Sequence, residues 1–476
     1  MSLGLAPAGV AGGAAAAGYA IGSGSWMPVV LLAVLVLVPS IIPYARRLLL
    51  AATVISLVLG SSIYPQLKVP IFYFRFFLIF ALLAATLKFP VVSSVRHSAG
   101  MVKCSFALVG LAVTSVVWSV NPSVTLQRGI SLLLLLVVVL ESARRVWVSV
   151  AEVARDLAFV ATAVGVTFVI GLVSAAAGME SALAGGRFRG ILENPNGVGV
   201  VGALMLPISL GFVGDRQGRR RLWWAGVAVA TAMSLVFSQS RGGILAAGLG
   251  VVVLVGLSRG VRRPLVVVAS CVVGTALLTG LGSTETRLPG PIEAVVVRFD
   301  QDSTAGGRTA AWQLALRLAR ERPATGWGFG TSEEVFGPEV HTIGSVFQGA
   351  LVHNSYLQIL LELGPAGVFL LLLVLSGALI FGWPSAGADP LRAAIYGALI
   401  AGSVSAVVES TLLSVGSIFG FTFWFLAAAS VHLRWLASAD SSAESPIAFT
   451  QAEGNPLLTR RAWQSAPVGG IGWRRT

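Results

Sequence analysis

Long apolar runs recur along the whole of this 476-residue chain, separated by short polar segments. Many of them are about 17–25 residues long, enough for an α-helix to cross a hydrocarbon layer of about 30 Å. Only 11% of the residues are charged, whereas an ordinary soluble domain carries about a quarter. A transmembrane β-barrel would show alternating segments of about ten residues, which the sequence lacks. We therefore predict an all-α, polytopic membrane protein.

The apolar runs predict about 12–14 transmembrane helices and one long, partly helical extracytoplasmic loop. The spans lie near residues 27–44, 47–64, 69–87, 101–118, 126–143, 153–177, 196–213, 222–238, 243–258, 264–281, 354–382, 391–409 and 411–436, with Leu3–Ile21 as a weaker candidate. The chain then divides into N-terminal helices (1–281), the loop (282–352), C-terminal helices (353–436) and a tail (437–476). The tail is rich in Ser, Ala, Pro and Gly, which predicts a disordered cytoplasmic end.

Basic residues predict the orientation of the spans, because Lys and Arg concentrate on the cytoplasmic side of membrane proteins. Clusters fall at every second connection: Arg46–Arg47, Lys88 with Arg96, Arg144–Arg145 with Arg155, Arg216 with Arg219–Arg221, and Arg259 with Arg262–Arg263. Because these clusters account for much of the net charge of +13, we predict no nucleic-acid binding. The remaining connections, including the long loop, are predicted to face outward.

Several arginines lie in outward-facing connections, where the same rule makes them unexpected. Arg241, in "VFSQSRGGILAAG", stands at the outer end of a span, where it either anchors the helix end or faces a polar cavity. Arg187 and Arg189, in "GGRFRGILENPNGVG", precede a helix expected to start near Asn196, whose first N–H groups favour an anion. Arg128 enters its span from the same side. These arginines are candidates for binding an anionic substrate.

The long loop has an amphipathic pattern of its own, within "RFDQDSTAGGRTAAWQLALRLARERPATGWGFGT". A helix is predicted from near Arg308 to Pro323, with an apolar face of Trp312, Ala315, Leu316 and Ala319. Such a helix lies on the membrane or caps a cavity. Asp300–Gln301–Asp302 resembles the metal motif of nucleotide-sugar transferases. Those substrates are cytoplasmic while this loop is outside, so we interpret the motif as a turn.

His353 is predicted at the outer end of the span that opens with "LVHNSYLQILLELGPAGVF". An imidazole that titrates near neutral pH, close to arginines, suits a general base, although His353 can also simply anchor the loop. Glu362 is nine residues further on and about 180° around a regular helix. We therefore expect Glu362 to pair with a neighbouring helix rather than to join His353.

The sequence lacks the motifs of several common kinds of enzyme chemistry. The only lysines are Lys68, Lys88 and Lys103, and none follows a glycine, so the chain has no Walker A motif. No HExxH or paired His/Cys spacing suggests zinc, and Cys104 and Cys271 stand apart in apolar runs. We therefore predict no metal, ATP or other cofactor, and a reaction that draws on an activated substrate.

Four stretches, "ENPNGVG", "SQSRGG", "GRTAAWQLALRLARERPATGWGFG" and "HNSYLQILLELGPAG", occur in the order seen in the O-antigen ligase/polymerase superfamily, which this chain resembles. The resemblance implies a glycosyltransferase in the bacterial cytoplasmic membrane with its site on the extracytoplasmic face. Such enzymes move a glycan from a polyprenyl-diphosphate carrier to an acceptor hydroxyl without ATP or metal. The chain departs from the family in one extra predicted span before the long loop.

The family's catalytic arginine and histidine fall on Arg241 and His353, while Arg189, Asn196 and Arg128 match less specifically. We hypothesise that Arg189 and Arg241 clamp the diphosphate and His353 deprotonates the acceptor, which inverts the anomeric centre. Arg308 and Asn354 are further candidates for substrate binding.

The resemblance implies four kinds of partner: an undecaprenyl- or related polyprenyl-diphosphate glycan, a glycan or lipid acceptor, the bilayer and other envelope-assembly proteins. The sequence leaves ligase and polymerase open. A transporter or flippase of lipid-linked glycans or small anions is the alternative function. It would show broken helices and ionisable groups near the middle of the membrane. A scaffold for envelope assembly is the third option, and in a scaffold Arg241 and His353 would be replaceable.

Overall fold

The computed structural model describes residues 45–91, 99–215, 218–258, 308–339, 352–384, 388–414 and 416–443. The predicted spans 27–44 and 264–281, most of the long loop and the Asp300–Gln301–Asp302 motif lie outside these residues. The chain divides into two units, Met1–Arg434 and Trp435–Thr476, and the description below concerns the first.

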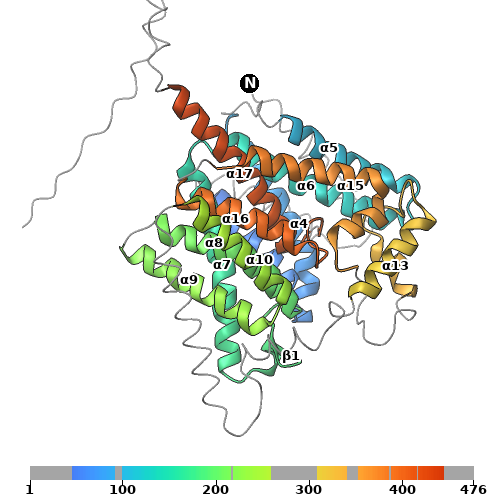
Figure 1. The fold of residues 1–476 in the computed structure, drawn as a ribbon, viewed down its shortest axis with the longest axis horizontal. Helices are drawn as coiled ribbons and strands as arrows, with labels where there is room; N and C mark the ends of the chain where they lie inside the picture. The colour runs from blue at the N-terminus through green and yellow to red at the C-terminus, as the bar shows by residue number, and fades with distance from the viewer. Residues whose placement is uncertain are drawn as a thin grey trace, which may run out of the picture. The chain divides into compact units, whose positions relative to one another are not determined.

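The described residues are almost entirely helical (Figure 1). The helices are α3 (Ala45–Gly60), α4 (Pro65–Leu87), α5 (Ala99–Thr114), α6 (Pro122–Arg145), α7 (Val150–Ala176), α8 (Pro195–Asp215), α9 (Gly218–Ser238), α10 (Arg241–Leu257), α13 (Arg308–Glu321), α14 (Ser332–Phe336), α15 (Ser355–Phe381), α16 (Pro390–Ser405) and α17 (Ile418–Ala443). Short 3₁₀ turns occur at Ser115–Val117 and Glu180–Ala182. Strands β1 (Leu183–Ala184) and β2 (Arg187–Phe188) form a small antiparallel hairpin before α8.

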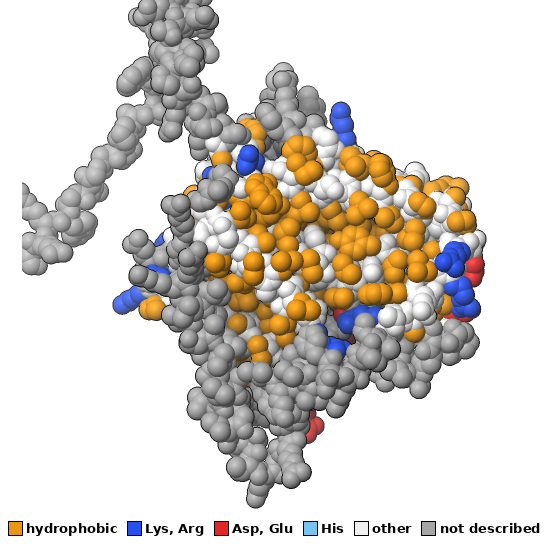
Figure 2. Space-filling model, in the orientation of Figure 1, with side chains coloured by type: hydrophobic (Ala, Val, Ile, Leu, Met, Phe, Trp, Pro, Cys, Tyr) orange, Lys and Arg blue, Asp and Glu red, His pale blue; other side chains and the backbone are white. Residues whose placement is uncertain are grey.

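The predicted fold class is confirmed: this is an all-α, polytopic membrane protein. Within the described residues, six helices are long and apolar enough to cross a membrane, and α10 and part of α4 form shorter apolar helices. Figure 2 shows one face covered mostly by apolar side chains, with Lys and Arg at the margins of the apolar area. Exposed large hydrophobic residues such as Phe369 and Ile380 on α15 are suited to lipid contact.

Every predicted span that falls within the described residues coincides with a helix, but the last two predicted boundaries are wrong. The spans 391–409 and 411–436 leave one residue for a turn, whereas α16 ends at Ser405 and α17 begins at Ile418. The segment between them, which we call the α16–α17 loop (residues 406–417), is apolar enough to be read as membrane helix. Its backbone is held by contacts from other parts of the chain, which hydropathy does not register.

Glycines bring α8, α10 and α16 into close contact. A Cβ atom on Gly243 of α10 would lie 2.6 Å from the Cα atom of Gly199 on α8, and one on Gly250 would lie 2.8 Å from the carbonyl oxygen of Gly397 on α16. Small residues allow helix backbones in a membrane to approach in this way. The first turns of α8 and α10 therefore meet, and the end of α16 lies beside them.

Helix α13 begins at Arg308 as predicted, but its buried face differs from the prediction. Its buried side chains are Ala311, Leu314, Ala315, Leu318 and Ala319, whereas Leu316 is exposed. This face packs on the first half of α15, together with Trp327 and Phe336. The helix therefore docks on protein, because α15 offers an apolar surface at its N-terminal end.

Helix α15 is broken at Gly364, where φ is 66° and Pro365 follows. A Cβ atom at Gly364 would lie 2.5 Å from the carbonyl oxygen of Ala324, so only glycine fits both the backbone conformation and the contact. The break lets the segment after α13 pack directly against the α15 backbone. The first half of α15 thus belongs with α13 as one compact cluster.

Candidate functional site

The α16–α17 loop organises the polar end of the helices. Ser355, the first residue of α15, donates its N–H to the carbonyl of Ala406 at 2.8 Å. Its hydroxyl donates to the carbonyl of Glu409 at 2.9 Å and accepts the N–H groups of Thr411 and Leu412 at 2.8 and 3.1 Å. These bonds satisfy the loop's buried backbone, so this apolar segment is held as an ordered loop at the start of α15.

His353 lies between this loop and α13. Its Nδ1 atom is 3.1 Å from Oε2 of Glu409, and Oε1 of the same carboxylate accepts a hydrogen bond from Arg308 at 2.6 Å. The indole N–H of Trp312 reaches the carbonyl oxygen of His353 at 3.4 Å. The structure thus connects Arg308, Glu409 and His353 in one row, with each side chain less than one fifth exposed.

The row has a defined charge state at its centre. Burial would raise the pKa of Glu409, but the hydrogen bond and charge of His353 and the Arg308 guanidinium together lower that pKa below its ordinary value. Glu409 is therefore ionised at neutral pH. An ionised carboxylate on Nδ1 directs acid–base chemistry of the imidazole to Nε2.

Arg241 begins α10, whose first turn contacts the α16–α17 loop. A Cβ atom on the next residue, Gly242, would lie 2.6 Å from a methyl carbon of Val408, which directly precedes Glu409. The "SQSRGG" and "HNS" stretches, more than a hundred residues apart in sequence, are therefore brought to the same loop.

Backbone strain marks the same two stretches. Among the described residues, Gln239 and His353 are the non-glycine residues with positive φ, each at 52°. Such conformations cost of order 1–3 kcal/mol and cluster at functional sites. One precedes Arg241 by two residues and the other is the candidate base.

The arginines that precede α8 have different surroundings. Arg187 donates to the side-chain oxygen of Asn196 at 2.8 Å and to the carbonyl of Ser238 at 3.0 Å, so it links α8 to the "SQSRGG" stretch. Arg189 instead donates to the carbonyl of Ser181 at 3.0 Å, in the 3₁₀ turn that precedes β1. The structure therefore places Arg187, rather than Arg189, beside Asn196. Side chains two residues apart on this hairpin point differently, which the sequence motif does not specify.

Arg128 and Glu362 hold the "GWGFG" turn. Arg128 donates to the carbonyl of Gly330 at 2.6 Å, and the N–H of Gly330 donates to Glu362 at 2.9 Å. Glu362 also accepts from Gln358 on its own helix at 2.9 Å and is fully buried. Ser332, which begins α14, also hydrogen-bonds Glu362, so the predicted pairing of Glu362 with a neighbouring helix is found with this short helix.

Asn354 caps α15, since its side-chain oxygen accepts the N–H groups of Tyr356 and Leu357 at 2.9 and 3.0 Å. Its own N–H donates to the hydroxyl of Ser410 at 3.2 Å. The observed contacts of Asn354 are therefore those of a helix cap that also holds the α16–α17 loop.

Two charged residues in or beside the α16–α17 loop were not identified from the sequence. Glu409 was assigned to the end of a span, although a carboxylate between the last two apolar runs was a usable signal. Arg75 of α4 is buried and donates to the carbonyl of Gly416 at 2.6 Å, so it also contacts the α16–α17 loop. Its signal was a lone arginine within "FYFRFFLIF", since charges inside an apolar run are costly.

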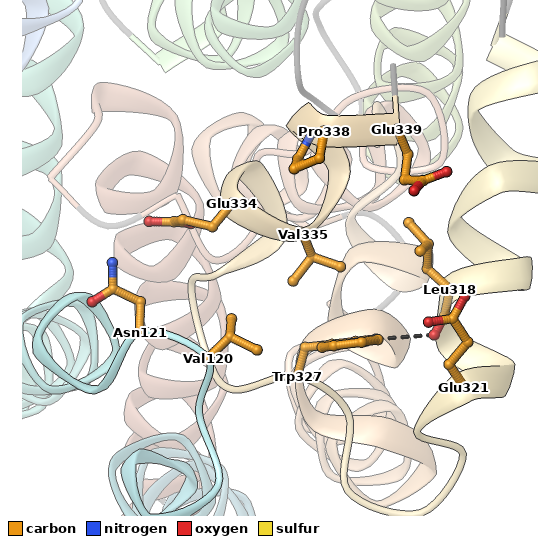
Figure 3. Close-up of a pocket in the computed structure, with 9 residues that line it drawn as sticks. All are labelled: Val120, Asn121, Leu318, Glu321, Trp327, Glu334, Val335, Pro338 and Glu339. Carbon is orange, nitrogen blue, oxygen red and sulfur yellow. Dashed lines mark hydrogen bonds between the residues drawn. The ribbon is translucent and has the colours of Figure 1, made fainter. Parts of the chain in front are cut away.

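A hollow of about 430 Å³ opens where α13, α14 and the α5–α6 connection meet (Figure 3). Trp327 and Val335 form an apolar surface at its centre, and its other lining residues are Val120, Asn121, Leu318, Glu321, Glu334, Pro338 and Glu339. Its polar rim is acidic, in contrast to the arginines near the α16–α17 loop. Among the described residues, no cluster of His, Cys, Asp and Glu is suited to a metal ion.

These features define a class: a polytopic α-helical membrane protein with a histidine–carboxylate pair and arginines gathered at one end of its helices. Residues 226–372 match the family model described as O-antigen ligase, a stretch that includes Arg241, Arg308, His353 and Asn354. The chain is also 26% identical over 344 residues to the exopolysaccharide production protein ExoQ of Rhizobium meliloti (strain 1021), covering 68% of this chain and 75% of ExoQ.

Both matches support the similarity to the O-antigen ligase-like superfamily that the sequence motifs predicted. This is a family of polysaccharide biosynthesis whose members are glycosyltransferase-like membrane enzymes acting on lipid-linked polysaccharide substrates.

Proposed function

We propose that this protein transfers a glycan from a polyprenyl-diphosphate carrier to an acceptor hydroxyl at the outer face of the cytoplasmic membrane. One observation carries the proposal: the arginine stretch that begins α10 and the histidine that precedes α15 meet at the α16–α17 loop, through Val408 and Glu409. Glycan transfer requires the donor diphosphate and the acceptor hydroxyl to be brought together at one place, as these two stretches are.

The donor side has the chemistry that a diphosphate requires. Helices α8, α10 and α15 begin at this end, and the N–H groups of a helix's first turn favour anions. Arg241 and Arg187 lie there, and guanidinium groups bind phosphate oxygens through paired, charge-assisted hydrogen bonds. In our proposal Arg187 takes the place that the sequence motif assigned to Arg189, because Arg187 contacts Asn196 and Ser238.

The transfer itself is a displacement at the anomeric carbon. His353 takes the proton of the acceptor hydroxyl as the acceptor oxygen bonds to that carbon. The carbon–oxygen bond to the phosphate breaks, and its electron pair leaves with the polyprenyl diphosphate, whose added negative charge the arginines stabilise. A single displacement inverts the configuration of the anomeric carbon, and His353 then releases its proton to water. The step needs neither ATP nor a metal.

The Arg241→Ala variant tests the donor side. We expect its turnover to fall about 10²–10³-fold, because a charge-stabilising donor in the transition state is lost. Purified protein in vesicles would be given a polyprenyl-diphosphate glycan and an acceptor, and the product would be measured. Arg155→Ala is the matched control. Arg155 is half exposed and pairs with Glu152 near the start of α7, whereas the hairpin with Arg187 follows the end of that helix. Transfer at the wild-type rate by Arg241→Ala would remove Arg241 from the site.

The same vesicles distinguish transfer from transport. The break in α15 beside buried Glu362 is a feature that transporters show. In this protein, however, Glu362 accepts hydrogen bonds from Gly330, Gln358 and Ser332, so the carboxylate serves to attach the turn after α13 and the start of α14. Movement of intact donor across the bilayer without formation of product would support a flippase and overturn the transferase.

The hollow around Trp327 is the proposed binding site for the acceptor glycan. Its apolar centre and carboxylate rim suit the faces and hydroxyl groups of a neutral sugar. We expect Glu334→Gln and Glu321→Gln each to raise the acceptor KM about three- to tenfold, as the loss of one hydrogen bond would, with the donor KM unchanged. Glu333→Gln is the control, because Glu333 faces Arg128 outside the hollow. Unchanged acceptor KM in both rim variants would exclude this position for the acceptor.

A further inference from the structure

We propose that Glu409 is a positioning residue that orients the His353 imidazole, and that helix α13 completes this arrangement by holding Glu409 through Arg308. The inference rests on the proposed function, in which His353 is the base. It adds a residue that the sequence motifs did not identify. It also gives the extracytoplasmic helix a part in assembling the site.

The two oxygens of Glu409 have separate partners. Oε2 lies 3.1 Å from Nδ1 of His353, and Oε1 lies 2.6 Å from a terminal nitrogen of Arg308. A carboxylate bound at both oxygens cannot rotate without breaking one of the bonds. Because Glu409 is only 14% exposed, water competes poorly for either contact.

Helix α13 contacts His353 from two directions. Arg308 reaches it through the Glu409 carboxylate, and Trp312, one turn further along α13, donates its indole N–H to the His353 carbonyl at 3.4 Å. His353 itself has the strained φ of 52°, which persists only where surrounding contacts impose it. Docking of α13 on α15 thus imposes both the backbone conformation and the ring orientation of His353.

This arrangement matters for the proton transfer. With Nδ1 donating to Glu409, Nε2 carries the lone pair that accepts the proton of the acceptor hydroxyl. The ring becomes an imidazolium as the new bond to the anomeric carbon forms, and the Glu409 carboxylate stabilises that charge. When the proton leaves Nε2 for water, the original state is restored, so Glu409 stays ionised and exchanges no proton.

Glu409→Gln is the principal test, because the amide preserves shape and removes the negative charge. We expect kcat to fall about 10²-fold, as misplacement of a catalytic group does, while the donor KM stays within twofold. Glu180→Gln, an exposed carboxylate in the connection between α7 and α8, is the matched control. A kcat within threefold of wild type would overturn the proposal.

A second readout does not depend on transfer. Diethyl pyrocarbonate modifies neutral imidazole, so the pH dependence of its reaction, followed by mass spectrometry of the peptide containing His353, reports the ring's protonation. Among the described residues, the charged groups near the ring include Glu409 from the α16–α17 loop and Arg308 from α13. Loss of the Glu409 charge should move the midpoint of the modification to lower pH, because the neighbouring negative charge favours the protonated ring.

Arg308→Met is the complementary variant, because it leaves Glu409 in contact with the ring but removes the positive charge behind it. The modification midpoint should then move to higher pH, opposite in sign to Glu409→Gln. Arg308→Met also covers the case in which Glu409→Gln fails to fold. Unshifted midpoints in the folded variants would refute the positioning role. Shifted midpoints together with wild-type protein that forms no product would leave Glu409 as the partner of His353 and overturn the proposed function alone.

Discussion

Replacing His353 with alanine should lower kcat about 10²–10⁴-fold, the range contributed by a general base. The reason is that the acceptor hydroxyl would have to lose its proton without help as it attacks the anomeric carbon. The donor KM should change little, because the proposed diphosphate ligands Arg241 and Arg187 are untouched. Steady-state transfer from a polyprenyl-diphosphate glycan, with donor and acceptor varied separately, measures both quantities.

His353→Gln keeps a polar side chain of similar reach but has no basic nitrogen, so its kcat should be as low as that of His353→Ala. His432, the other histidine among the described residues, contacts the carbonyl of Trp147 away from the site. Folded His432→Gln should therefore retain transfer. A His353→Gln variant with wild-type kcat would show that His353 is not the base.

Replacing Asp156 with alanine should destabilise the protein by about 3–5 kcal/mol, because it leaves a buried arginine without its counter-ion. Asp156 of α7 is fully buried and accepts two hydrogen bonds from Arg46 of α3, at 3.0 and 2.7 Å. It also accepts the indole N–H of Trp147 at 2.9 Å. Arg46 further donates to the hydroxyls of Ser142 and Thr86. The Arg46–Asp156 pair thus joins α3, α4, α6 and α7.

Thermal unfolding in detergent measures this effect. Asp389→Asn is the control, because Asp389 and Arg392 form a partly exposed pair at 3.7 Å whose loss should cost about 0–1 kcal/mol, and asparagine can keep the helix-capping bond to the N–H of Leu391. The double variant Arg46→Leu/Asp156→Leu should recover much of the lost stability, since removing both charges removes the desolvation penalty. An Asp156→Ala protein as stable as the control would mean that the pair contributes nothing to this end of the helices.

Hydropathy was sufficient to locate the helices within the described residues, because the free energy of moving a segment into hydrocarbon is nearly a sum over its own residues. It failed between α16 and α17 for the same reason. The segment "VVESTLL" is apolar on average, yet Ser355 satisfies its backbone from a distant part of the chain. A contact that joins residues far apart in sequence has no local signal.

The candidate site was predicted in part. Arg241 and His353 stand in motifs that resemble the family, and Arg308 was expected at the start of a helix. Glu409, the common partner of His353 and Arg308, was missed, because it lies 56 residues from His353 and 101 from Arg308. The choice between Arg187 and Arg189 was also beyond the sequence, since it depends on which way each side chain leaves a short hairpin.

By itself, then, the sequence determined the membrane class, the helix positions and the arginine and histidine stretches, because transfer free energy and short motifs are local properties. The tertiary structure alone decided that these stretches meet, that α13 docks on α15 and that Glu409 stands between Arg308 and His353. The reason is physical: glycine contacts between α8, α10 and α16 set how closely these helices approach, and the loop at their end takes its position from that packing.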